Sequence, residues 1–302
     1  MGRIILLFLV LPSLLTSCAN RDNSSEFNAL FSDKKYQQAL ELSLKWQKSE
    51  PDNSEAYVAV SNAYFQLAVV EAPASPRPPG NGDSSLIDPT TGKTAANIAP
   101  PVNYEPVRMK SAVDNLAAAT VKFPSRLDIW IGLAYLYQRA DDFPNEIETL
   151  TKAMRFASAF PERLRWFKNQ ALPKPPEILV PETMQDFCAY IQNRFKPNWE
   201  DYAKLSQLTA DYYPLHPYAF DNLGNYYLLR REWDKSEKNY LKAHALAPAD
   251  SLILNNLGNF YDEKKDFSRA RMYFEKTIAL NNDPGAAAEA GQRIKRLEKA
   301  GH

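Results

Sequence analysis

Five asparagines in the last third of the chain offer the clearest side-chain chemistry in this sequence. An asparagine amide has two hydrogen-bond donors and an acceptor, so it can pair with the backbone of an extended peptide whatever the sequence of that peptide. The asparagines form two groups about 34 residues apart: Asn222 and Asn225, then Asn255, Asn256 and Asn259. This is chemistry for binding rather than for catalysis.

Catalytic, metal-binding and nucleotide-binding patterns are missing from the sequence. It has no Gly-x-Ser-x-Gly, no His-Glu-x-x-His and no dinucleotide glycine fingerprint, and its 3 histidines are scattered. Gly92-Lys93-Thr94 could end a phosphate loop, but Ile87 stands where that loop needs its first glycine. Lys+Arg and Asp+Glu both number 36, so no basic face for nucleic acid is expected. We predict that the protein is not an enzyme and uses no metal or cofactor.

The elements that must position the asparagines repeat at an offset of 34 residues, as residues 217–250 and 251–284. Gly224 and Gly258 stand at equivalent places, where the lack of a side chain lets a neighbouring helix approach closely. Large residues of the first copy share one face of a helix at i, i+3 and i+7 spacing: Phe220, Leu223 and Tyr227. These residues are predicted to pack rather than to react.

The order Leu-Gly, Tyr, Ala, aromatic residue and Pro within each copy closely resembles the tetratricopeptide repeat. The resemblance implies an all-α fold, a right-handed superhelical solenoid of about six helix-turn-helix repeats. We expect the solenoid over residues 26–284, and a capping helix and tail over 285–302.

Two stretches interrupt the expected repeats. Residues 71–105 are rich in Pro, Gly, Ser and Asn without apolar periodicity, which predicts a long loop inserted within one helical hairpin. Residues 160–171 are expected to extend as a helix, and residues 172–181 to form a proline-rich break before a fourth repeat that starts at Glu182. Cys188 is expected to be a small buried residue of a helix.

The resemblance also implies a concave face formed by fixed positions of the first helix of each repeat. In the two clearest repeats these positions give a partner-binding groove: Tyr218, Asn222, Asn225, Leu229, Leu252, Asn255, Asn256 and Asn259. Asp221, Asp262 and Glu263 are placed on the same face, so the groove is expected to prefer neutral or basic segments. The alternative is that the asparagines hydrogen-bond between helices.

Residues 1–17 are expected to be a signal peptide, because Arg3 precedes an apolar run too short to span a bilayer. Leu15-Thr16-Ser17-Cys18 is similar to the bacterial lipobox, which implies cleavage before Cys18 and acylation, including palmitate, of that cysteine. Residues 18–25 would then be a lipidated tether. An ordinary secretory signal is the alternative. Ala19 after the cysteine favours the outer membrane, facing the periplasm.

These features predict a membrane-anchored scaffold of the bacterial envelope that holds protein or peptide partners in its concave groove. The anchor would raise the effective concentration of a partner near the membrane. Two other classes stay open: a permanent structural subunit of an envelope secretion or assembly complex, and an envelope enzyme that handles glycans.

Overall fold

A computed structural model of the chain describes residues 22–70, 85–87, 94–97, 103–194 and 197–302. The predicted signal peptide, Cys18 and the Gly92-Lys93 pair lie outside these described residues.

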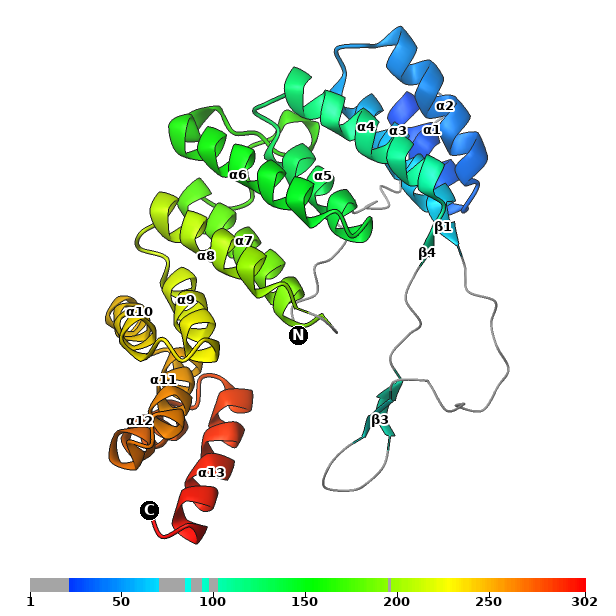
Figure 1. The fold of residues 1–302 in the computed structure, drawn as a ribbon. Coiled ribbons are helices and arrows are strands. Elements are labelled where there is room, and N and C mark those ends of the chain that lie inside the picture. The colour runs from blue at the N-terminus through cyan, green and yellow to red at the C-terminus, as the bar shows by residue number, and fades with distance from the viewer. Residues whose placement is uncertain (1–21, 71–84, 88–93, 98–102, 195–196) are drawn as a thin grey trace. The chain divides into compact units, whose positions relative to one another are not determined.

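The described chain is all-α apart from four short strands, and its helices follow one another in six pairs and a last single helix (Figure 1). The pairs are α1 (Asn23–Ser32) and α2 (Tyr36–Ser49), α3 (Ser54–Ala68) and α4 (Pro106–Lys122), α5 (Leu127–Arg139) and α6 (Phe143–Ala159), α7 (Pro176–Gln192) and α8 (Trp199–Tyr212), α9 (Pro217–Leu229) and α10 (Trp233–Leu246), and α11 (Ser251–Glu263) and α12 (Phe267–Leu280), followed by α13 (Pro284–Lys299). The sequence prediction of about six helical repeats is therefore confirmed.

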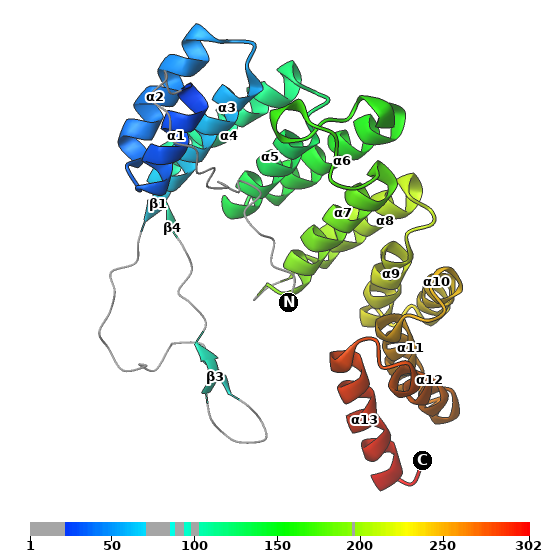
Figure 2. The same ribbon diagram turned by 180° about the vertical axis from the view of Figure 1, so that it is seen from behind.

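The described residues form two compact units. An N-terminal unit holds residues 22–146 and 167–170, and a C-terminal unit holds residues 147–166 and 171–302. In the N-terminal unit α2, α3 and α4 pack side by side, as Figure 2 shows from behind. In the C-terminal unit α9 packs on α10, α11 on α12, and α13 on both α11 and α12.

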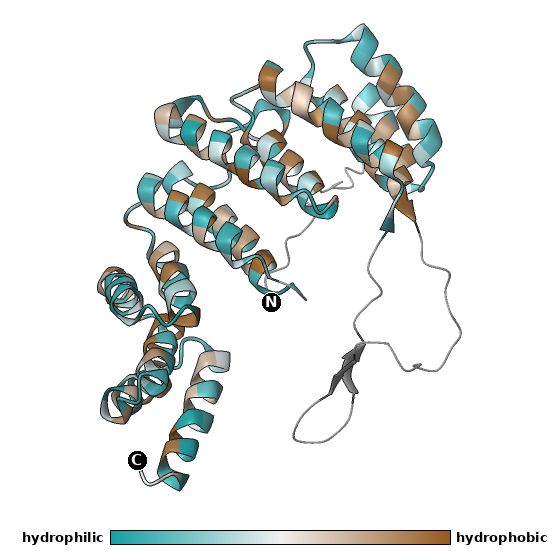
Figure 3. Ribbon diagram, in the orientation of Figure 1, coloured by the Kyte–Doolittle hydropathy of each residue, from teal (hydrophilic) through white to brown (hydrophobic). Residues whose placement is uncertain are grey.

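Each helix mixes hydrophobic and hydrophilic residues along its length, as expected for a helix that buries one stripe (Figure 3). The stripes meet in clusters within each unit. Leu116 and Leu133 belong to a cluster of the N-terminal unit, and Leu257 and Phe274 to a cluster of the C-terminal unit. No helix of the described residues is both long enough and apolar enough to cross a membrane.

The repeat signature residues pack as predicted. A Cβ atom added at Gly224 would lie 2.6 Å from Cδ1 of Tyr240, and one at Gly258 would meet the ring of Phe274 in the same way. Both rings are completely buried. The two glycines therefore let the second helix of each pair approach the first, because any side chain there would collide with an aromatic ring.

The stretch between α3 and α4 contains paired strands, so the prediction of a plain loop over residues 71–105 was incomplete. β1 (Val69–Val70) pairs antiparallel with β4 (Asn103–Tyr104), and β2 (Ser85–Ile87) pairs antiparallel with β3 (Thr94–Asn97). Strands this short leave no visible period in the sequence. The insertion does interrupt a hairpin, because α3 and α4 pack against each other.

The helix predicted over residues 160–171 was wrong. The segment contains two 3₁₀ turns, η1 (Pro161–Arg163) and η2 (Phe167–Asn169). Lys168 and Asn169 have φ angles of 55° and 56°, in the left-handed region that a right-handed helix excludes.

Helix α7 starts earlier than predicted, because it includes most of the proline-rich stretch 172–181. Pro176 occupies the first turn, where a missing N–H leaves no helical bond unmade. Pro181 lies inside the helix, where it removes one backbone hydrogen bond, and its ring is buried. Cys188 is a buried residue of this helix, as predicted.

The first helix also starts earlier than predicted. α1 begins at Asn23, inside the range 18–25 assigned to a tether, and Oδ1 of Asp22 accepts a hydrogen bond from the Ser25 amide at 2.7 Å. Asp22 therefore caps the helix, since a carboxylate at this position satisfies a free amide of the first turn.

Candidate functional site

The first helices α7, α9, α11 and α13 contact one another in succession within the C-terminal unit. Eight polar side chains connect them, and we call this set the amide seam: Gln185, Asp221, Asn222, Asn225, Asn255, Asn256, Asn259 and Glu289. The seam contains all five asparagines of the predicted groove.

Between α7 and α9 the seam is formed by Asn222. Its Nδ2 donates to Oε1 of Gln185 at 2.7 Å, and its Oδ1 accepts from the hydroxyl of Tyr202 at 2.9 Å. Asn222 is buried, so its amide is committed to neighbouring helices.

Between α9 and α11 the seam centres on the carboxylate of Asp221. Oδ2 of Asp221 accepts from Nδ2 of Asn256 at 2.8 Å and, at 3.5 Å, from Nδ2 of Asn225. Oδ1 of Asn225 accepts from the hydroxyl of Tyr240 at 2.7 Å. Asn225 therefore links this joint to the second helix of its own pair.

Between α11 and α13 the seam uses a carboxylate of the capping helix. Nδ2 of Asn255 and Nδ2 of Asn259 donate to the two oxygens of Glu289 at 3.0 and 3.2 Å. One turn further along, Asp262 forms ion pairs with Arg293 and Arg296.

The placement of the asparagines favours the alternative reading of the sequence, hydrogen bonds between helices. Asn222 and Asn255 are buried and cannot present an amide to a peptide without displacing a neighbour, so these two residues are withdrawn from the candidate contact surface. Asn225, Asn256 and Asn259 are half-buried. Each of these three donates its amide N–H to a carboxylate of the same unit.

The apolar members of the predicted groove are accessible. Leu229 is 57% exposed and Leu252 is 39% exposed. Leu252 and Tyr218 line an open cleft at one end of α9 and α11, together with Ala247, Pro248, Ala249, Asp250, Asn282 and Asp283. The structure thus brings together two of the predicted residues, from successive repeats, in one cleft.

Carboxylates form the polar wall of this cleft. Asp250 caps α11 through Oδ1 and accepts from the hydroxyl of Tyr218 through Oδ2 at 2.6 Å. Asp283 caps α13 by accepting from the Ala286 amide at 2.9 Å. No side chain that lines the cleft is basic. The cleft therefore combines apolar surface with negative charge.

The sequence did not single out Gln185 or Glu289, although the repeat period contains a signal for Glu289. Asp221, Asn255 and Glu289 stand 34 residues apart in succession, so they occupy the same place in three first helices. Residues at one place of stacked repeats are neighbours in space. Gln185 lies in a repeat too irregular for this comparison.

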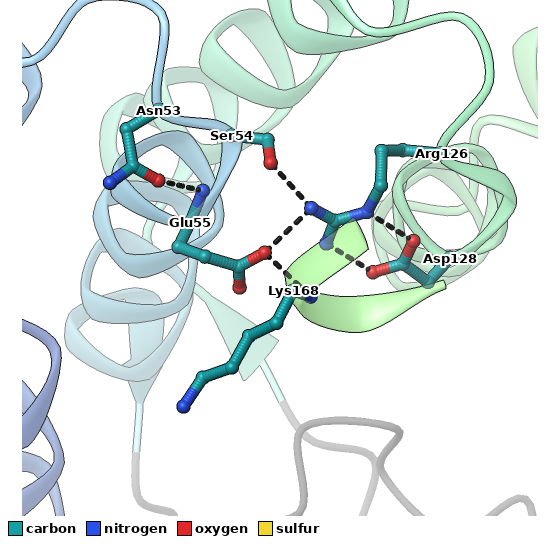
Figure 4. Close-up of polar contacts among 6 residues, drawn as sticks. All are labelled: Asn53, Ser54, Glu55, Arg126, Asp128 and Lys168. Atoms are coloured by element: carbon teal, nitrogen blue, oxygen red, sulfur yellow. Dashed lines mark hydrogen bonds and ion pairs between the residues drawn. The ribbon is translucent and has the colours of Figure 1, made fainter. Parts of the chain in front are cut away.

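A second polar cluster lies in the N-terminal unit, around the buried guanidinium of Arg126 (Figure 4). Arg126 binds Asp128 through two parallel hydrogen bonds of 2.9 and 2.8 Å and forms an ion pair with Glu55 at 2.6 Å. Its Nη1 also donates to Ser54. Oε1 of Glu55 accepts in addition from the backbone N–H of Lys168 at 2.9 Å.

The Arg126 cluster has the features of a structural clamp. Carboxylate partners raise the pKa of the guanidinium against the opposing effect of burial, so Arg126 stays charged. The cluster joins the start of α3, the turn before α5 and the η2 turn. Its two carboxylates, Glu55 and Asp128, both form ion pairs with Arg126. Within the described residues no group of His, Cys, Asp and Glu side chains is arranged to hold a metal ion.

No protein-family model matches this chain, and no curated protein matches its sequence. Solved structures do match. The C-terminal part of a tetratricopeptide-repeat protein from Cytophaga hutchinsonii is similar with a TM-score of 0.50 at 12% identity, over 92% of this chain and 89% of that chain. The chain thus has the tetratricopeptide-repeat fold.

Two further solved structures are similar at lower scores. YrrB, described as a tetratricopeptide protein with an unusual peptide-binding site, matches with a TM-score of 0.41 at 11% identity, over 84% of this chain and 100% of that chain. PilW, described as a type IV pilus biogenesis factor, matches with a TM-score of 0.37 at 13% identity, over 85% of this chain and 91% of that chain.

Proposed function

We propose that this protein is a scaffold that binds segments of other proteins and is attached to a membrane of the bacterial envelope by a lipid on Cys18. The observation that carries the binding proposal is the open cleft at the ends of α9 and α11, where Tyr218 and Leu252 lie beside Asp250 and Asp283. A repeat fold supports this use, because stacked helix pairs offer an extended surface to a partner.

The cleft defines the chemistry of the partner segment. Leu252 and Pro248 offer apolar contact, while Asp250 and Asp283 attract positive charge and no lining side chain repels it. The segment we propose therefore carries a basic side chain next to an apolar one. Such a segment gains apolar contact and charge complementarity together.

A photo-cross-linking amino acid placed at Leu252 tests this proposal in cells that produce the full chain. We expect one defined protein to be captured there and not from the same amino acid at Lys238, an exposed position on the second helix α10. Adding the substitutions Asp250→Asn and Asp283→Asn should reduce capture several-fold, since both keep a helix-capping oxygen while removing charge. Equal capture from both positions would contradict the cleft as the binding site.

The anchor has its own test. The lipobox-like sequence ending at Cys18 supports the proposal that the chain is held at the outer membrane and faces the periplasm. Cells fed a labelled palmitate analogue should incorporate it into the wild-type chain, which should sediment with membranes. A Cys18→Ala chain should lose the label and much of its sedimentation. A labelled Cys18→Ala chain would contradict lipid attachment at this residue.

A second candidate function is a permanent subunit of an envelope assembly. It is favoured by four exposed apolar side chains on the second helices α10 and α12: Leu241, Met272, Ile278 and Leu280. A permanent subunit buries such residues against a partner. In detergent extracts it would migrate entirely as a larger complex, whereas an exchangeable scaffold leaves a free fraction.

A further inference from the structure

Asp221 is a buried carboxylate without a cation. Asp221 is 3% exposed, and within the described residues no lysine, arginine or histidine is among the groups that set its pKa. The two hydrogen bonds to Oδ2 come from the neutral amides of Asn256 and Asn225, and Oδ1 is buried without a donor. A buried charge in such surroundings is costly unless it is neutralised.

Asp262 of α11 is a buried carboxylate whose charge, unlike that of Asp221, is compensated by neighbouring arginines. It is nearly as buried, yet Arg293 lies 3.7 Å away and Arg296 is in direct contact. Both arginines come from α13, the next first helix in the stack. At the α9–α11 joint no arginine or lysine of the described residues is paired with Asp221, and its partner on α11 is the amide of Asn256.

We propose that Asp221 makes the joint between α9 and α11 responsive to protons: neutral Asp221 lets the two helices close on the amides of the seam, and ionised Asp221 loosens them. Asn256 passes the change to α11, which carries Leu252 on the candidate cleft. The effect on a bound partner rests on the proposed function, whereas the response of the joint does not.

Among the groups that surround Asp221, the amide of Asn256 favours the ionised form, whereas the other groups oppose ionisation or leave it uncompensated. Asp250, at the start of α11, is an acid, and Tyr202 of α8, Tyr218 of α9 and Tyr240 of α10 are neutral phenols whose own pKa values are raised by burial and, to a smaller extent, by Asp221. Burial, and then the charge of Asp250, raise the pKa of Asp221 to about 7 against the hydrogen bond from Asn256.

The direction of the effect follows from linkage. A carboxyl whose pKa is higher in the folded than in the unfolded chain binds its proton more tightly when folded, so its contribution to stability is lost as the pH rises through the folded pKa. Between pH 5.5 and 8, a folded pKa of about 7 corresponds to a roughly thirtyfold rise in the unfolding constant.

Urea unfolding of the full chain at pH 5.5 and 8 tests the proposal when wild type is compared with Asp221→Asn. The asparagine keeps an oxygen for Asn256 and cannot ionise. The unfolding constant of wild type, divided by that of Asp221→Asn, should therefore rise by about thirtyfold from pH 5.5 to pH 8. Asp234→Asn, a change at an exposed carboxylate of α10, should leave the pH dependence of wild type unaltered.

Carbon-13 NMR of aspartate carboxyls gives a second measurement that needs no partner and no stable variant. One carboxyl signal should titrate near pH 7, and the Asn256 side-chain amide should shift with the same midpoint. An Asp221 signal that titrates near pH 4, or parallel stability curves for wild type and Asp221→Asn, would overturn the proposal. Neither result depends on whether the cleft binds a protein segment.

Discussion

Gly224 and Gly291 are both helical glycines, yet only the first is needed for packing. The Cβ of Gly224→Ala would lie 2.6 Å from the buried ring of Tyr240, whose hydroxyl is held by Asn225. Because the ring cannot yield, overpacking should lower the free energy of unfolding by about 1–3 kcal/mol.

Nothing lies within 4 Å of a Cβ added at Gly291, in the cap helix. Gly291→Ala should therefore stabilise by roughly 1 kcal/mol, through helix propensity alone. Urea unfolding of the two variants should show a decrease in the free energy of unfolding for Gly224→Ala and an increase for Gly291→Ala. Equal effects would contradict the role given to the repeat glycine.

Arg126 is expected to matter more than any exposed ion pair of the chain. Arg126→Met would leave Asp128 and Glu55 without their cation in a buried position, which should cost about 3–5 kcal/mol of unfolding free energy. Arg230→Met is the matched control, because the Arg230 side chain is 51% exposed and solvent screens its ion pairs, so their loss should change stability little. Thermal unfolding of both variants shows which substitution is the more destabilising. A smaller loss of stability in Arg126→Met than in Arg230→Met would contradict a structural role for the Arg126 cluster.

At the residue scale, the sequence predicted packing better than it predicted the site. The 34-residue period identifies Gly224, Gly258 and their aromatic partners, because each must recur for the helix pairs to stack. The period cannot tell whether an asparagine faces a peptide or the next helix. That depends on partners such as Gln185 and Glu289, which lie on other helices and accept hydrogen bonds from the amide N–H groups of Asn222 and Asn255.

At the scale of elements, prediction succeeded where helices repeat and failed where the chain leaves the repeat. The residues of η2 have ordinary helix-forming types, so a helix was the natural reading of the sequence. Its turn is instead held by the hydrogen bond from Lys168 to Glu55, two residues separated by 113 positions. Local periodicity carries no information about such a contact. The early start of α7 was hidden because prolines suit both a break and the first turn of a helix.

The insertion between α3 and α4 should be removable if its base is kept. Tyr104 in β4 stacks on Phe65 of α3 with ring centroids 5.5 Å apart, and Glu105 caps α4 through two backbone amides. Replacing residues 71–102 with a short turn should therefore leave helicity and melting temperature nearly unchanged. Extending the deletion through Glu105 should lower the melting temperature clearly, since it removes both contacts. Circular dichroism follows both chains, and a large loss from the shorter deletion would show that the insertion supports the fold.

Each unit of the whole molecule is a stack in which a helix depends mainly on its neighbours. In such an array, stability is close to a sum of repeat and nearest-neighbour terms, so damage at one end should fade with distance along the stack. Helix α13 is the end of the C-terminal unit. It contributes Ala290 and Leu297 to the cluster around Leu257 and supplies the arginines that pair with Asp262.

Removal of residues 283–302 should therefore destabilise the nearest helices most and the more distant helices of the C-terminal unit progressively less. Backbone amides of α11 and α12 should lose the most protection from hydrogen exchange, because their apolar face becomes exposed and Asp262 loses both of its arginine partners. Amides of α9 and α10 should lose less, and those of α7 and α8 least. Lys295→Ala, an exposed change on α13, is the control and should leave all of them protected. A uniform loss from α7 to α12 would instead mean that the C-terminal unit unfolds as one cooperative block, with the amide seam coupling its helices too strongly for nearest-neighbour behaviour.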